Sequence, residues 1–572
     1  MTEPRTNRAR APIHALLIDS LDDEHEVSVV RGALAATRDG SSTLLCIAGG
    51  ALGHVDPDQA SRNFAFDLLR SDGVRGGVVL SSAIGNSVGP VRLAEWLTRF
   101  AGIPLCSAGV TLAGYPSVRV DNAAGIREGV RHLVQVHGKR AIGFIRGPAA
   151  SAEAEERLEA YRAGLRAEGI EPDDRHVVDG DFEKASGVQA VKILFDQRRA
   201  SVHTLDALFA ANDYMAIGAL EELLRRGLQV PEQIAVVGFD DVDSAHNARP
   251  ALTTIRQPAE PLGRAAIALL RNLCDGRASD ATELLATELV VRRSCGCAAT
   301  DLASAAGAQF AFTSVGVETA FVQRRQIMTA ELARAAHGTL GGAGTAWESR
   351  LIEALLSELR GGGSGRFSSK LRQMLQGVEH SGGDASAAPE VIAALRRQAL
   401  PCVAGDPVAR DRLEEALHDG QLVAASLVAE VAVARIQRSG ARFRGLARRV
   451  HAAMFRDPGQ LSQVLAETLP SFGIEACLIA ELGAANDPLG DGRILCGFGP
   501  SGQRATNERC VLRALCVHPM LENTSRSFFL LPIALGGKPT GILLLSTAMI
   551  DGRLLEDLRD LFGTVLGLST LG

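Results

Sequence analysis

Residues 206–258 read DALFAANDYMAIGALEELLRRGLQVPEQIAVVGFDDVDSAHNARPALTTIRQP, a pattern that predicts a complete β–α–β unit. The apolar run 207–210 predicts a short strand that stops at Asn212, a residue type that often caps a helix. Apolar residues then recur at helical spacing over 214–224. The run 234–238 is apolar and rich in β-branched residues, which is typical of a parallel strand buried on both faces.

A polar residue follows each of these two strands. Asn212 comes after the first strand and Asp240 ends the second. Because ligands in open α/β sheets bind beyond the carboxyl ends of the strands, we expect both side chains to face one crevice. The alternative is that they only cap helices, and the two roles are compatible.

Several ordered motifs resemble the sensor core of the LacI-type (lactose-repressor) family, whose core has the type I periplasmic-binding-protein fold. They are AANDYMAIGAL, VPEQIAVVGFDD and PALTTIRQP, with VDNAAGIREGVRHLVQVHGKRAIGFIRG upstream, and Arg157 and Tyr161. The resemblance covers residues 13–297. It implies a two-lobed sensor domain over residues 11–298, with parallel sheets and a hinge that can close on a ligand.

The resemblance also implies a ligand site. Asp240 and Asn212 match the family's hydrogen-bonding pair for ligand hydroxyls, Arg157 its cleft-facing arginine, and Phe182 an aromatic ring that stacks on a sugar. The remaining expected ligand residues are Gln257 on the crossover strand and Asp19 and His25 in the first-strand loop. Carboxylate, amide and guanidinium groups together suit a sugar or polyol, because each hydroxyl both donates and accepts.

Strands and helices alternate along the rest of this half, as in a doubly wound parallel sheet. In the first lobe we expect strands at 14–18, 43–47, 77–81 and 104–107, and helices at 27–36, 64–69 and 91–100. In the second lobe we expect strands at 141–145 and 176–178 and a helix at 157–168. The resemblance implies that the chain crosses between lobes near residues 121–122, 254 and 288.

Composition narrows the class of protein. The 572 residues carry a net charge of −6, so no overall basic field favours nucleic acid. The ten cysteines are scattered, which fits reduced thiols. With no secretory signal and no apolar run near the ~20 residues of a membrane helix, a cytoplasmic protein without membrane contact is expected.

Residues 1–10 are expected to be a disordered tail, too short for the helix-turn-helix headpiece of LacI-type repressors. The tail therefore does not support a direct DNA-binding role.

The segment RRSCGC, residues 292–297, closes the sensor core. Cys295 and Cys297 supply two possible metal ligands, but the nearby sequence holds no His or Cys at metal spacing. We therefore expect a structural or incidental pair, with no metal and no cofactor.

A helical signalling region is expected over residues 299–452. Helical spacing occurs at 317–335, 347–359, 367–378, 389–400 and 410–436, with glycine-rich breaks at 340–344, 360–365 and 381–389. His337, His380 and His418 lie in no phosphoacceptor motif, so solvent-facing histidines are expected. A basic run follows at Arg435, Arg438, Arg442, Arg444, Arg448 and Arg449. A solvated connector helix is favoured for it over a nucleic-acid contact.

Residues 453–572 return to mixed α/β patterning. Strands are predicted at 476–482 and 493–497, a hairpin at 527–534 and 540–546, and helices at 461–469 and 554–568. The order resembles a GAF-type α+β sensor domain in pattern only.

These features predict a non-catalytic sensor that binds a small polar ligand between two lobes and transmits closure to the C-terminal regions. By resemblance it is expected to form a homodimer, and its signal is expected to leave through a signalling or DNA-binding partner protein. The alternative is a LacI-related transcriptional regulator that contacts DNA through an unrecognised segment or partner. An enzyme is disfavoured, because no GxxxxGK[ST] or HExxH motif is present.

Overall fold

The computed structural model describes most of the chain in two compact units. The described residues are 11–277, 282–297, 316–336, 340, 344–361, 365–380, 387–456, 460–483, 487–500, 502, 504–522, 524, 527–548 and 550–569. One unit combines the segments up to Leu302 and from Ala447 onward, and the other spans Ala303–Leu446. The expected tail at residues 1–10 lies outside the described part.

The first lobe is a parallel sheet in the order β11-β5-β4-β3-β1-β2. Its strands are β1 (Ile13–Ile18), β2 (Thr43–Ala48), β3 (Val74–Leu80), β4 (Leu105–Gly109), β5 (Ser117–Val120) and β11 (Glu283–Leu285). Its helical elements are α1 (Glu24–Thr37), α2 (Pro57–Ser61), η1 (Arg62–Arg70), α3 (Ser81–Ile84), α4 (Gly89–Leu97), η2 (Thr98–Phe100) and α10 (Ala259–Cys274). The helix expected at 64–69 is the 3₁₀ segment η1.

Helices α1 and α10 pack closely because each has a glycine where it contacts the other. A β-carbon on Gly32 would lie 2.0 Å from the Glu260 carbonyl oxygen, and one on Gly263 would lie 2.0 Å from the Val29 carbonyl oxygen.

The second lobe is a six-stranded sheet in the order β12-β10-β9-β8-β6-β7. Its strands are β6 (Ile142–Arg146), β7 (Val177–Asp179), β8 (Ala207–Ala210), β9 (Ala235–Asp240), β10 (Thr253–Arg256) and β12 (Glu288–Val290). All pairs are parallel except β10 with β12. Its helices are α5 (Asn122–Gln135), α6 (Ala152–Ala167), α7 (Lys184–Lys192), α8 (Asp213–Arg225) and α9 (Asp243–Asn247).

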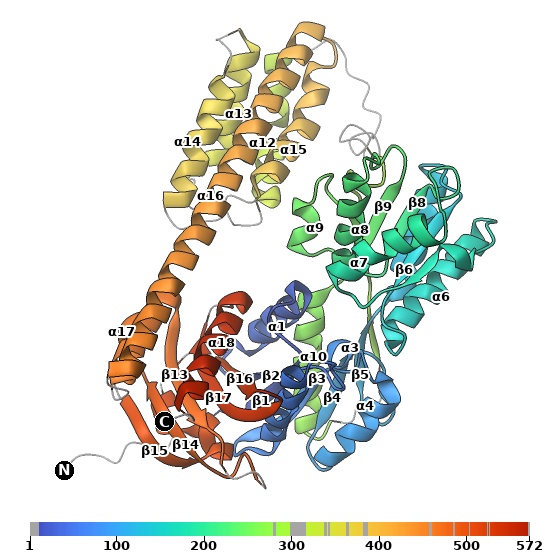
Figure 1. Ribbon diagram of the computed structural model, residues 1–572. Helices are drawn as coiled ribbons and strands as arrows, with labels where there is room; N and C mark the ends of the chain where they lie inside the picture. The colour runs from blue at the N-terminus through green and yellow to red at the C-terminus, as the bar shows by residue number, and fades with distance from the viewer. Residues whose placement is uncertain are drawn as a thin grey trace. The chain divides into compact units, whose positions relative to one another are not determined.

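The chain passes between the two sheets three times, after β5, after β10 and between β11 and β12 (Figure 1). The two-lobed arrangement and the predicted β8–α8–β9 unit are therefore confirmed.

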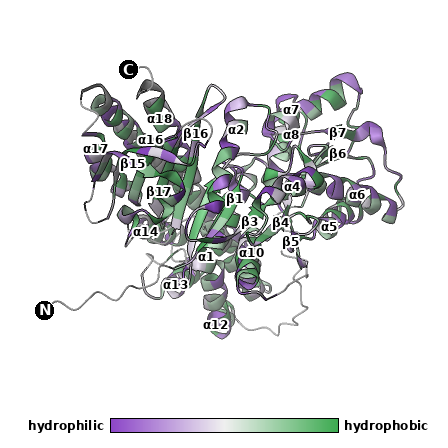
Figure 2. Cartoon of the chain, turned by 90° about the horizontal axis from the view of Figure 1, so that it is seen from below, coloured by the Kyte–Doolittle hydropathy of each residue, from purple (hydrophilic) through white to green (hydrophobic). Residues whose placement is uncertain are grey.

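The C-terminal segment extends the first lobe's sheet. It contains β13 (Ile474–Glu481), β14 (Asp491–Phe498), β15 (Arg504–Val511), β16 (Ser527–Leu535) and β17 (Lys538–Thr547), with α17 (Leu461–Thr468) and α18 (Gly552–Ser569). The predicted hairpin is β16–β17. Strand β16 also pairs in parallel with β2, which joins both parts in one eleven-stranded sheet. Figure 2 shows hydrophobic residues along strands of this sheet, β1 and β17 among them, whereas β15 is mostly polar and exposed.

The second unit is helical, as predicted. It contains α12 (Val317–Ala335), α13 (Trp347–Leu359), α14 (Arg366–His380), α15 (Ala388–Ala399) and the start of α16 (Pro407–Arg456), around a shared apolar core. His418 is exposed on α16, whereas His337 and the His380 side chain lie outside the description, as do most of the glycine-rich breaks. Within the described residues, no helix is both long enough and apolar enough to cross a membrane.

The basic run lies within the single helix α16, which continues from the helical unit into the other unit. Arg449 pairs there with Glu467 at 2.5 Å and donates to the Thr468 hydroxyl at 3.0 Å. The side chains of Arg435 and Arg438 lie outside the description. A continuous helix fits the predicted connector.

Candidate ligand cleft between the two lobes

Asp240 ends strand β9 in an unusual backbone conformation. Its φ is 122°, and the next residue, Asp241, has a φ of 62°. This turn places the Asp240 carboxylate beside Gln257, whose amide donates to Oδ1 at 2.5 Å. Burial raises the pKa of Asp240 to about 7, although the Arg157 charge and the Gln257 hydrogen bond lower it.

Arg157 is the centre of the expected site. Only 2% of it is exposed. Its Nε donates to the Asn122 side chain at 3.0 Å, and its Nη1 donates to the Ala211 carbonyl at 2.6 Å. The guanidinium lies 3.8 Å from Asp240 and 3.6 Å from Glu153. Its position is therefore fixed from several sides before any ligand binds.

Two aromatic rings border this guanidinium. The Arg157 carbon Cζ lies 4.0 Å from the centre of the Phe239 ring and 5.9 Å from that of Phe182. Phe182 itself has a φ of 72°, and its ring packs on Gly147, where a β-carbon would come within 2.4 Å of it.

Asn212 does cap α8, as the alternative reading held. Its Oδ1 accepts from the Met215 amide at 3.0 Å, while its Nδ2 donates to the Phe182 carbonyl at 2.8 Å. The residue therefore fixes both the start of α8 and the position of Phe182. Of the seven predicted site residues, these contacts join five: Asp240, Arg157, Gln257, Asn212 and Phe182.

The two first-lobe residues lie in the segment after β1. Burial lowers the pKa of His25, the charges of Asp23 and Glu153 raise it, and the charge of Arg157 lowers it. His25 therefore interacts electrostatically with two residues of the cleft, Glu153 and Arg157. Burial likewise raises the pKa of Asp19. The hydrogen bonds of Asp19 run within the first lobe: its amide donates to Glu26 at 3.2 Å and its carbonyl accepts from Gly50 at 3.0 Å.

Glu24, at the start of α1, joins the two lobes. Its carboxylate accepts hydrogen bonds from the amide and hydroxyl of Ser244, and its amide donates to the Tyr214 hydroxyl at 3.2 Å. Sequence reasoning missed Glu24, because nothing in its local pattern indicates partners 190 and 220 residues away.

A cavity of about 360 Å³ is lined from both lobes. Its lining residues are Pro90, Gly109, Val110, Thr111, Arg119, Ala152, Glu153 and Glu156. None of the seven predicted residues is among them, but Glu153 connects the cavity to Arg157. Arg119 binds Glu156 through both carboxylate oxygens, at 3.0 and 3.1 Å.

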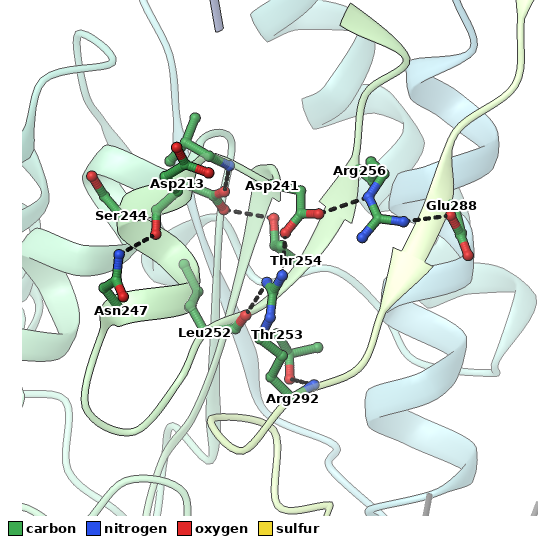
Figure 3. A network of polar contacts seen from close by, with 12 residues as sticks. Asp213, Asp241, Ser244, Asn247, Leu252, Thr253, Thr254, Arg256, Glu288 and Arg292 are labelled. Carbon is green, nitrogen blue, oxygen red and sulfur yellow. Dashed lines mark hydrogen bonds and ion pairs between the residues drawn. The ribbon is translucent and has the colours of Figure 1, made fainter. Parts of the chain in front are cut away.

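A polar network holds the end of β9 to the crossover strands (Figure 3). Asp241 pairs with Arg292 at 2.6 Å and with Arg256 at 2.7 Å, and Arg256 reaches Glu288 at 3.0 Å. The fully buried Asp213 accepts from the Thr254 hydroxyl at 2.6 Å and from the Val242 amide at 3.1 Å. The turn that carries Asp240 is thereby tied to the hinge.

The C-terminal part contacts the loop after β1. Glu556 of α18 accepts a hydrogen bond from the Leu21 amide at 3.1 Å and forms an ion pair with Arg559. A β-carbon on Gly552 would lie 2.0 Å from the Leu21 carbonyl oxygen, so helix and loop touch directly.

The cysteine pair has histidine partners, contrary to the sequence-based expectation. His132 and His137 lie beside Cys295 and Cys297 although about 160 residues separate them along the chain. A local search for ligand spacing could not find them, because the fold alone brings the two segments together.

Residues 130–295 match the family model described as a periplasmic binding protein-like domain. The chain contains a periplasmic binding protein-like domain of the LacI type. The matched residues do not include the helical region or the C-terminal α/β region.

Curated relatives are similar over the same part. The chain is 38% identical over 224 residues to the HTH-type transcriptional regulator CelR of Thermobifida fusca, which covers 38% of this chain and 63% of CelR. It is 35% identical over 180 residues to the HTH-type transcriptional repressor CytR of Escherichia coli K12, covering 31% of this chain and 51% of CytR. The chain thus spans about half to just under two thirds of these relatives.

Among solved structures, a transcriptional regulator CelR–cellobiose complex is 30% identical, with a TM-score of 0.43. The match covers 50% of this chain and 86% of that one.

Proposed function

We propose that this protein is a non-catalytic regulatory sensor that binds a small polar ligand, of the sugar or polyol class, between the two lobes of its LacI-type domain. The observation that carries the proposal is the placement of Arg157. Its guanidinium is held by Asn122 and the Ala211 carbonyl and lies beside Asp240, at the ends of parallel strands where ligands bind in such folds.

The chemistry of these groups favours hydroxyl-bearing ligands. Asp240 offers acceptors, Arg157 and Gln257 offer donors, and the Phe182 ring offers an apolar face for the C–H side of a sugar. The relatives add support, since the similar regulator CelR has been solved in complex with cellobiose.

Closure of the lobes on the ligand would supply the signal. Glu24 reaches across to Ser244 and Tyr214, so the arrangement of the lobes seen here has interlobe contacts that a more open state would lack. A ligand that bridges the lobes shifts the equilibrium by its differential affinity for the closed form.

The loop after β1 provides a route to the C-terminal part. That loop runs from Asp19 to Asp23, and Glu556 of α18 binds it at Leu21. We infer that movement of the loop on closure is passed to α18, then through the GAF-like domain to α16 and the helical region. We also propose that the protein forms a homodimer and passes its signal to a downstream partner protein.

A second candidate is transcriptional regulation with DNA contact. Its support is the sequence similarity to CelR and CytR, both HTH-type transcriptional regulators. The two candidates differ in one measurement, the binding of the full chain to a random pool of duplex DNA with and without sugar. Selection of specific sequences would favour the second candidate.

The ligand proposal is tested by a thermal-shift screen of the full chain against monosaccharides, disaccharides including cellobiose, polyols and nucleosides. Ligand at about 100 times its dissociation constant adds roughly 2.7 kcal/mol of stability. The hit should disappear in Asp240→Ala and persist in Asp179→Ala, whose carboxylate is exposed at the end of β7. A hit that survives Asp240→Ala would move the site elsewhere.

A further inference from the structure

Two segments from distant parts of the sequence meet in the second lobe. His132 lies in the last turn of α5 and His137 just beyond it, while Cys295 and Cys297 lie in the turn after β12. The ligand atoms of all four side chains lie within 4.8 Å of one another, the one such group of three or more His, Cys, Asp or Glu residues among those described.

The separations fit a tetrahedral metal ion. Zinc bonds of about 2.05 Å to nitrogen and about 2.3 Å to sulfur place two nitrogens about 3.3 Å apart, and a nitrogen and a sulfur about 3.6 Å apart. The two histidine Nε2 atoms lie 3.3 Å apart. The nitrogen–sulfur distances are 3.4 Å for His132 to Cys295, 3.7 Å for His132 to Cys297 and 3.3 Å for His137 to Cys297.

The backbone is shaped to bring the two cysteines to the same point. Gly296 has a φ of 113°, and a β-carbon there would lie 3.1 Å from the His137 ring. Ser294 anchors the turn to the sheet, because its hydroxyl donates to the Val236 carbonyl at 2.6 Å and accepts from the Thr253 amide at 2.8 Å. Glycine between the cysteines is therefore required both by the turn and by the neighbouring imidazole.

We propose that His132, His137, Cys295 and Cys297 bind one zinc ion as a Cys₂His₂ structural site. Four protein ligands close the coordination shell, which distinguishes a structural site from a catalytic one with an open position. On binding, each thiol releases its proton to solvent, and two thiolates with two neutral imidazoles leave a site with no net charge.

The position of the site gives the ion a specific role. Cys297 is the last described residue of the sensor core before the chain continues toward the helical unit, and His132 lies on α5. Asn122, at the other end of α5, accepts from Arg157 in the ligand cleft. Zinc would fasten the exit of the sensor core to the helix that begins at the cleft. This inference does not depend on the proposed ligand.

The test is metal analysis of the full chain purified without chelator. We expect about one zinc per chain in the wild type, and its loss in Cys297→Ser and in His132→Gln. The matched controls are Cys274→Ser, a half-buried cysteine outside the cluster, and His203→Gln, an exposed histidine, and both should keep the metal. Zinc retained in full by Cys297→Ser would overturn the assignment.

A second measurement avoids dependence on variants that fold poorly. Wild-type protein stripped with a chelator is titrated with Co²⁺, and the expected spectrum has tetrahedral d–d bands with a thiolate charge-transfer band. Zinc should then displace cobalt and raise the melting temperature. Failure to take up either ion, or a Cys295–Cys297 disulfide found by mass spectrometry in protein kept under reducing conditions, would contradict the proposal.

Discussion

At the scale of single residues, Asp240 is a carboxylate whose ionised form is destabilised by burial. The carboxylate is nearly buried, and its hydrogen bond from Gln257 and the nearby Arg157 only partly offset the loss of water. A group with this balance gains when a ligand supplies further donors, because those donors take over the role of the excluded water.

The raised pKa of Asp240 predicts a pH dependence of stability. The folded carboxyl titrates near about 7, whereas the unfolded one titrates near its ordinary value of 3.8, so the folded state binds the extra proton between these values. The contribution of Asp240 to stability is therefore greatest at low pH and falls as pH rises toward 7. Asp240→Asn removes this titration.

Urea unfolding at pH 5 and pH 8 measures the effect. The stability of the wild type relative to Asp240→Asn should fall over this interval by about 1 kcal/mol or more per pH unit up to pH 7. A difference between the two proteins that stays constant with pH would show that Asp240 keeps an ordinary pKa.

The close packing around Gly238, two residues before Asp240, predicts that a larger side chain there destabilises the protein. A β-carbon there would lie 2.1 Å from Oδ1 of the buried Asp213, so Gly238→Ala should destabilise the protein by about 1–3 kcal/mol or more. In Gly445→Ala, on α16, the β-carbon would meet nothing within 4 Å. That control should be neutral or stabilising by about 0.5–1 kcal/mol in urea unfolding.

At the scale of elements, the spacing of apolar residues correctly predicted helices and strands whose formation depends on their own local sequence. The bounds of α12 and α13 follow the apolar spacing of 317–335 and 347–359, and the β16–β17 hairpin follows its two apolar runs. Strand β15 was not predicted, because its sequence RATNERCV is mostly polar and exposed and so has no alternation of apolar and polar residues.

Contacts between distant segments could not be predicted. The pairing of β2 with β16, the Glu24 link between the lobes and the histidines beside Cys295 each join residues more than 150 positions apart. The resemblance did lead to Arg157, Asp240, Asn212, Phe182 and Gln257, which contact one another, but their ligand role remains a prediction.

The contact between α18 and the loop after β1 predicts a cost for breaking it. Glu556 and Arg559 are a buried ion pair, and Glu556 also holds the Leu21 amide. Glu556→Ala should destabilise the protein by about 3–5 kcal/mol, because it leaves Arg559 buried without that partner. Glu522→Ala, outside this contact, is the control in the same denaturation series, and equal losses in both variants would refute the special role of Glu556.

At the scale of the whole molecule, the interlobe contacts of Glu24 predict weaker ligand binding when they are removed. Glu24→Ala should lower the affinity for the thermal-shift hit about 5- to 30-fold, equivalent to about 1–2 kcal/mol. The control Glu128→Ala, which changes a half-exposed residue of α5, should bind as the wild type does. Calorimetric titration checks this, and unchanged affinity in Glu24→Ala would mean that closure does not use these contacts.

Hydrogen exchange of the full chain, with and without the identified ligand, tests the central claim most directly. The account predicts slower exchange on both sides of the cleft at once, in residues 19–27 of the first lobe and 211–216 and 240–245 of the second. It also predicts a change in α18 near Glu556, which binds the first of these segments. Protection confined to one lobe, or to the C-terminal strands alone, would contradict a ligand held between the lobes.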